Sequence, residues 1–167
     1  MTPGELLADS LDRVAEHVEA VLDGLDVDAL THRPGPGANT IGWLVWHLTR
    51  VYDDHVAAAA GREQVHVASG YAERLGLPFD PADTGFGHSS DEVAAVRVPA
   101  DLLGDYFREV HGAMRPWVHG LDAADLDRVV DERWDPPVTL GVRLVSVADD
   151  CAQHAGQAAY VRGLLGR

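Results

Sequence analysis

Apolar residues recur every three or four positions in four long stretches of the chain, and this spacing predicts four amphipathic helices. The stretches cover about residues 3–25, 39–61, 101–121 and 139–165. Strand-type alternation of apolar and polar residues is sustained nowhere. The pattern therefore predicts an all-α protein.

The segments between these stretches indicate how the helices are connected. Residues 62–99 are interrupted by closely spaced Gly and Pro, with one short helix expected at 71–75. A connection this long is uncommon in a compact domain and is typical of a crossover or a functional lid. Residues 122–137 are acidic and predicted to be a loop, and Pro116 is expected to kink or break the third helix. We therefore predict a single-domain four-helix bundle over residues 1–167 whose pairing is not simple up-down-up-down.

The charge balance excludes several classes of function. With 13 basic and 27 acidic residues the net charge is −14, which repels nucleic acid and anionic lipid. All the basic residues are Arg, so Schiff-base chemistry and a phosphate-binding P-loop lysine are excluded. No apolar run reaches the roughly 18 residues that suggest a membrane span. Cys151 is the only cysteine, which rules out an intrachain disulfide. A cytoplasmic domain is expected.

Three side chains with metal-binding chemistry border the predicted core. Asp150 and His154 are four residues apart, so they share one face of the last helix, beside its apolar stripe. His47 has the same placement on the second helix. Metal sites in bundles combine a chelating pair on one helix with a ligand from another. The same residues also fit a structural interpretation, in which His47 is a core histidine and Asp150 and His154 form a modest helix pair.

Other residues with chemical potential favour structural roles. His55 is interpreted as packed in the core, and Asp53 and Asp54 as solvated or helix-paired. His88 precedes a helix N-cap, in a segment that is also able to fold over a pocket. The last two features are Cys151, predicted to be a buried structural thiol, and the Trp134-Asp-Pro-Pro segment, predicted to be a rigid corner rather than a recognition element.

Two segments together resemble the DinB-like superfamily of four-helix-bundle metalloproteins. NTIGWLVWHLTRVYDDH, at 39–55, is similar to the second helix of that superfamily, and DCAQHAGQ, at 150–157, is similar to its last-helix motif. The resemblance covers nearly the whole chain. It is closest to an actinobacterial branch and extends, more distantly, to the N-terminal domain of mycothiol-dependent maleylpyruvate isomerase. It implies an up-down-down-up bundle with the long crossover between helices two and three.

The resemblance also implies a ligand set for a divalent metal ion. The family's second-helix histidine falls on His47 and its final histidine on His154. The ligand one turn earlier is His or Glu in relatives and is Asp150 here, one methylene shorter than Glu. Two imidazoles and a carboxylate leave an open coordination position, as in catalytic zinc sites. Zn²⁺ is expected, and the same ligands suit Ni²⁺ or Fe²⁺.

The occupant of that open position would decide the function. The resemblance implies a low-molecular-weight thiol, of the mycothiol or bacillithiol type, that attacks a small electrophile in an S-transferase or isomerase reaction. Water in the same position would instead give a metal-dependent hydrolase. A non-catalytic bundle that serves in metal binding or dimerisation is the third reading. The resemblance also implies a homodimer, since many relatives pair through helix faces, and the aromatic edge of the second helix would supply such a contact.

Overall fold

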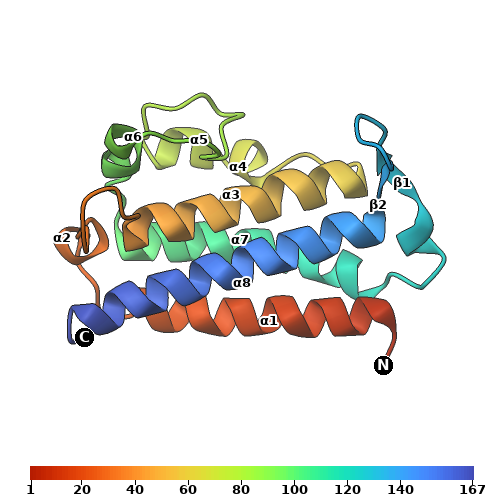
Figure 1. Cartoon of the computed structure of the whole chain (residues 1–167), viewed down its shortest axis with the longest axis horizontal. Helices are drawn as coiled ribbons and strands as arrows, with labels where there is room; N and C mark the ends of the chain where they lie inside the picture. The colour runs from red at the N-terminus through yellow and green to blue at the C-terminus, as the bar shows by residue number, and fades with distance from the viewer.

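Four long helices lie side by side in the computed structural model, which describes residues 1–167 (Figure 1). They are α1 (Pro3–Leu22), α3 (Ile41–Ala60), α7 (Ala100–His119) and α8 (Leu140–Leu164). Each corresponds to one predicted amphipathic stretch, so the all-α four-helix prediction is confirmed. Thr40 and Thr139 cap α3 and α8, because the side chain of each accepts a hydrogen bond from a backbone N–H group in the first turn of its helix.

Short elements fill the connections between these helices. They are α2 (Val27–Leu30), α4 (Val65–Ala68), α5 (Tyr71–Arg74), α6 (Ser90–Ala95), the 3₁₀ turn η1 (Asp125–Asp127) and the strands β1 (Val129–Asp131) and β2 (Val138–Thr139). The strands pair antiparallel, with Val129 opposite Thr139. This hairpin lies where only a loop was predicted, because two strands of two and three residues are too short to show an alternating pattern.

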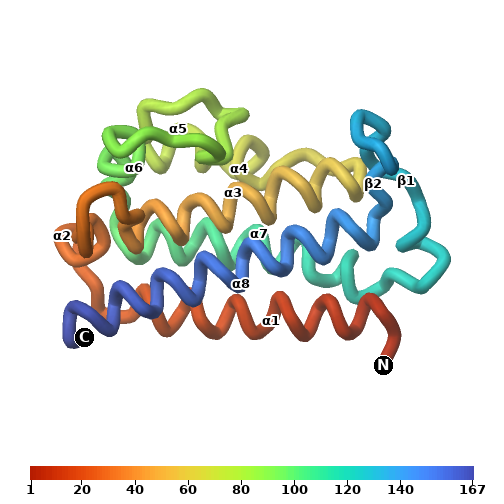
Figure 2. The backbone as a smooth tube through the Cα atoms, viewed as in Figure 1, coloured from red at the N-terminus to blue at the C-terminus, as the bar shows by residue number.

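The helices form an up-down-down-up bundle. α1 and α8 run in one direction and α3 and α7 in the other, as the tube in Figure 2 shows. Each of α3 and α1 packs against both α7 and α8. Since α3 and α7 are parallel, the chain must return along the bundle between them, and the crossover that carries α4, α5 and α6 does so (Figure 1). The predicted topology is therefore confirmed.

The crossover makes α3 the most enclosed of the long helices, with 15 of its 20 residues buried. Trp43 and Trp46 are only 6% and 2% exposed. The aromatic edge of α3 is thus covered by the chain's own crossover, and the expectation that it forms a dimer contact is wrong.

Helix α7 passes through Pro116 and ends three residues later, at His119. Of the two expected effects of this proline, a kink or a break, the break does not occur. Proline removes one backbone donor, and here this happens within the last turn of the helix, where the backbone N–H of Gly120 bonds the carbonyls of Pro116 and Trp117. None of the helices is both long enough and apolar enough to cross a membrane.

Candidate metal centre

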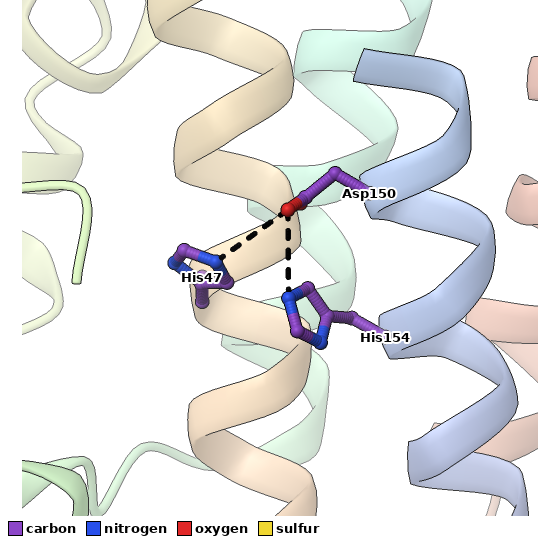
Figure 3. A group of neighbouring side chains, drawn as sticks. All are labelled: His47, Asp150 and His154. Carbon is purple, nitrogen blue, oxygen red and sulfur yellow. Dashed lines mark ion pairs between the residues drawn. The ribbon is translucent and has the colours of Figure 1, made fainter. Parts of the chain in front are cut away.

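His47, Asp150 and His154 meet between α3 and α8, and Figure 3 shows their side chains pointing toward one another. Asp150 Oδ1 lies 4.0 Å from His47 Nε2 and 3.5 Å from His154 Nε2. One ligand atom from each residue lies within 4.8 Å of the others. The three residues singled out in the sequence are therefore brought together, although about 100 positions separate the first from the others.

Hydrogen bonds at the far side of each imidazole orient the rings. His47 Nδ1 donates to the carbonyl oxygen of Thr84 at 2.5 Å, and His154 Nδ1 donates to Gln157 Oε1 at 3.0 Å. With Nδ1 protonated, Nε2 of each neutral ring keeps its lone pair directed toward Asp150. Metal-binding histidines are commonly fixed in this way by a carbonyl or carboxylate partner.

The electrostatics of the three residues suit a cation. Burial lowers the pKa of His47, which favours its neutral form, whereas the nearby carboxylate of Asp150 raises the pKa of His154. Asp150 Oδ2 is buried and has no hydrogen-bond partner. A buried carboxylate oxygen without a partner is costly, and a divalent cation would satisfy it. The donor set therefore fits a metal ion.

The crossover holds His47 in place from the side opposite Asp150. Trp43 stacks on the imidazole of His47, with ring centroids 4.6 Å apart. Gly85 lies against the rings of His47 and Trp46. A Cβ atom at this position would come within 3.0 Å of His47 Nδ1 and 2.8 Å of Trp46, and the φ of +91° also favours glycine. The backbone at 84–85 can reach His47 only because residue 85 has no side chain.

His88 lies farther along the same segment. Its Nδ1 accepts a hydrogen bond from Trp43 Nε1 at 3.1 Å, and its Nε2 donates to Asp83 at 2.9 Å. Ser89 forms the N-cap of α6. The segment therefore caps a helix, as one of its two interpretations predicted, and its residue Phe86 lines a cavity beside α3.

A buried polar network that the sequence analysis missed anchors the crossover. Arg50 is fully buried and donates to the carbonyl oxygens of Pro81 and Asp83 at 3.1 and 3.0 Å. Asp53, predicted to be solvated or helix-paired, is also fully buried and accepts hydrogen bonds from the Tyr106 hydroxyl and two backbone N–H groups. Arg50 and Asp53 are three residues apart and share one face of α3, and this spacing is the feature of the sequence that could have indicated the network. Asp54, half-exposed, accepts from Gln64.

A cavity of about 480 Å³ opens beside His47 and Asp150. Its walls come from α3, α8, residues 84–86 of the crossover and the β1–β2 hairpin. His55 lines this cavity and contacts Arg143, with 3.0 Å between His55 Nδ1 and Arg143 Nη1. The prediction that His55 is packed in the core is therefore wrong, because the residue sits near the end of α3, where the hairpin leaves the helix face open.

The structure agrees fully with the prediction for Cys151 and only in part with the prediction for Trp134. Cys151 is buried against the carbonyl of Leu48, and burial raises the pKa of its thiol. This confirms the prediction of a buried thiol. Trp134 is 65% exposed in the β1–β2 turn and lines the cavity with Phe86, which is 94% exposed. The Trp134 segment therefore contributes to the cavity as well as forming a corner.

Comparison with known proteins identifies the family and the fold. The family model described as mycothiol-S-transferase matches residues 6–166. A crystal structure of a conserved protein from Enterococcus faecalis is 32% identical, with a TM-score of 0.88, and the match covers 100% of this chain and 99% of that one. A DinB-like protein from Bacillus cereus ATCC 10987 is 19% identical, with a TM-score of 0.64, over 96% of this chain and 91% of its own. No curated protein matches the chain.

The family match spans nearly all of the chain and includes His47, Asp150 and His154, the three residues of the candidate metal site. The second solved structure shares the fold and is a DinB-like protein, which is the superfamily that the sequence motifs suggested. The chain belongs to the mycothiol-S-transferase family and has the DinB-like four-helix-bundle fold.

Proposed function

We propose that this protein is a divalent-metal-dependent transferase that activates a low-molecular-weight thiol, of the mycothiol or bacillithiol type, for attack on a small electrophile. The observation that carries the proposal is the position of the ligand cluster. His47 and Asp150 lie at the wall of a cavity of about 480 Å³, large enough for a small substrate. Family membership supports the thiol as one substrate.

His47, Asp150 and His154 would hold the ion, with Zn²⁺ as the expected metal and Ni²⁺ or Fe²⁺ as possible replacements. When bound, a divalent cation would supply a Lewis acid that lowers the pKa of a thiol placed beside it. The Thr84 carbonyl and the Gln157 amide keep Nε2 of each histidine unprotonated and aimed at the ion. These contacts would fix the two rings before the ion binds. Three protein ligands would leave one coordination position open, which is typical of catalytic rather than structural metal sites.

The rest of the site would bind and shield the electrophile. Val51, Val142 and Val147 line the cavity and offer an apolar wall, and Phe86 and Trp134 lie at its edge. An apolar wall limits the water that competes with the thiol for the electrophile. Cys151 has no role in this scheme, because its thiol is buried and its raised pKa keeps it protonated.

The test is conjugation of mycothiol or bacillithiol to a small electrophile by the zinc-loaded protein, compared with the uncatalysed rate. We expect the acceleration to persist below the solution pKa of the thiol, ~8.5 for an unperturbed cysteine. His154→Ala should abolish it, whereas Cys151→Ala and His17→Ala, at an exposed histidine of α1, should retain it. Activity that depends on Cys151 and not on His154 would contradict the proposal, as would a full panel of electrophiles without any acceleration.

A further inference from the structure

The cavity has two polar ends separated by an apolar middle. Because α3 and α8 are neighbours that run in opposite directions, positions 47, 51 and 55 of α3 follow the same course as positions 150, 147 and 143 of α8. His47 and Asp150 form the inner end, and Val51 and Val147 line the middle. At a rise of about 1.5 Å per residue, the outer end lies about 10–12 Å farther along the helices.

The outer end carries more positive than negative charge. Arg143, with 16% of its side chain exposed, contacts His55 through Nη1 and Asp131 through Nη2, each at 3.0 Å. Arg133 also binds Asp131, at 2.8 and 2.9 Å, and its side chain is 84% exposed. Burial and the Arg143 charge lower the pKa of His55, which favours the neutral form of this histidine. At this end of the cavity the guanidinium groups of Arg133 and Arg143 thus share a single carboxylate, that of Asp131.

This local surplus of positive charge contrasts with the net charge of −14 on the whole chain. Asp54 lies 3.4 Å from His55 but does not line the cavity. Asp131 keeps two hydrogen bonds from the Arg133 side chain if Arg143 turns to another partner. The guanidinium of Arg143 is thus able to bind an anionic group without leaving Asp131 unpaired, and its planar fork of donors matches a carboxylate.

We propose that the outer end of the cavity binds a carboxylate of the substrate, with Arg143 as the residue that selects for it. The carboxylate belongs to the thiol or to the electrophile, and its carrier has an apolar body that lies against Val51 and Val147. The assignment rests on the proposed function for the identity of the reacting groups. It places the reacting end of the ligand at His47 and Asp150 and its anionic end two helix turns away.

A binding experiment tests the carboxylate without any turnover. Calorimetry on the zinc-loaded protein compares 4-phenylbutyrate with its neutral amide. We expect wild type to prefer the carboxylate by about tenfold, the scale of one charge-assisted hydrogen bond. Arg143→Gln should remove the preference, Arg143→Lys should keep part of it, and Arg97→Gln, at an exposed arginine outside the cavity, should leave it unchanged. Because Arg143→Gln leaves the three metal ligands intact, a preference that survives in this variant would come from the ion and would overturn the inference.

A second variant keeps the test valid if Arg143→Gln does not fold. Ser146 is exposed, lies on α8 between Arg143 and Asp150, and lines the cavity. Ser146→Asp adds a carboxylate near the proposed anion site, and it should weaken 4-phenylbutyrate binding while the amide binds as before. Equal effects on the two ligands would contradict the inference. Circular dichroism and thermal melting would confirm that each variant is folded.

Turnover then separates the two carriers and the two proposals. One arm compares N-acetylcysteine with N-acetylcysteine amide toward a neutral maleimide, and the other compares N-(4-carboxyphenyl)maleimide with N-phenylmaleimide toward a neutral thiol. An Arg143-dependent preference in either arm supports the inference and identifies the carrier. Turnover with no such preference in either arm overturns it and leaves the proposed function standing. Arg143-dependent binding without turnover supports the carboxylate site and contradicts the proposed function.

Discussion

Asp150 has the shortest side chain that can supply a carboxylate to the ligand cluster. Its Oδ1 reaches both histidines, but only across 3.5 and 4.0 Å, while Oδ2 is buried without a partner. An ion between the three residues would therefore bind close to α8. The carboxylate also supplies the only negative charge in the cluster, because both imidazoles are neutral when they bind a metal.

Substitutions at Asp150 separate the roles of its charge and its length. Asp150→Asn keeps the shape and removes the charge, so we expect zinc affinity to fall by at least tenfold with unchanged helical content. Asp150→Glu keeps the charge and should retain binding. Competition with a chromophoric chelator measures both affinities, and Asp149→Asn, at the exposed neighbouring carboxylate, is the control. Wild-type affinity in Asp150→Asn would show that Asp150 is not a ligand.

At the scale of elements, the crossover and α3 depend on one close approach. Ala at position 85 would bring its Cβ to 2.8 Å from Trp46 and 3.0 Å from His47, at a φ of +91°. We expect Gly85→Ala to cost about 1–3 kcal/mol of stability and to weaken zinc binding, since the Thr84 carbonyl would be displaced from His47. Gly87→Ala is a matched control, because Gly87 has φ of +79° but no atom near the added Cβ. Equal zinc affinity in the two variants would contradict this account.

Helices α1 and α7 are joined by an ion cluster whose contribution depends on pH. Asp12 accepts hydrogen bonds from Arg115 at 2.8 Å and from His111 at 3.0 Å, and the Arg115 guanidinium holds the pKa of Asp12 below its usual value. The folded-state pKa is thus lower than the unfolded one. The stabilisation is present above the unfolded pKa, ~3.9, and is lost as pH falls through the folded value.

Asp12→Asn should therefore reduce the free energy of unfolding by about 0.5–1 kcal/mol at pH 7, a value kept small because the pair is partly exposed. The difference between this variant and wild type should shrink as pH falls below the unfolded value of ~3.9, for example between pH 7 and pH 3. Urea unfolding at both pH values measures it. Asp9→Asn removes an exposed carboxylate that pairs within α1 and should have little effect at either pH. A constant difference across pH would show that Asp12 acts through packing and not through its charge.

The long helices were predictable because each carries about 20 residues of sustained periodicity. The metal-ligand cluster was predictable in part, since Asp150 and His154 share a helix face, but the motifs of a known superfamily were needed to connect them to His47. The fold of the crossover was not predictable. Its hold on α3 comes from backbone carbonyls of Pro81, Asp83 and Thr84, and contacts made by carbonyls leave no pattern in the side chains. The contact between Arg143 and His55 was also not predictable, because it depends on the register between α3 and α8, which the sequence of either helix does not specify.

At the scale of the whole molecule, the bundle joins elements that are far apart in the sequence. The pairs α3–α8 and α1–α8 each connect distant parts of the chain, and the up-down-down-up order makes both pairs direct neighbours. The same architecture extends over the full length of the Enterococcus faecalis protein. The ligand cluster and the cavity both lie at the α3–α8 contact, and the crossover and the β1–β2 hairpin complete the walls of the proposed site.

The placement of the ligand cluster on α3 and α8 has a consequence for synthesis of the chain. His47 leaves the ribosome about 100 residues before Asp150 and His154, and translation at about 5–20 residues per second makes that interval several seconds or more. Contacts of such long sequence separation also form slowly, because closing the loop costs entropy before the contact is gained. During this interval the nascent chain offers a lone imidazole in place of a chelating site. If the three residues hold a metal ion as proposed, its selective uptake would wait until the last helix has docked, so the finished bundle and not the growing polypeptide would select the ion.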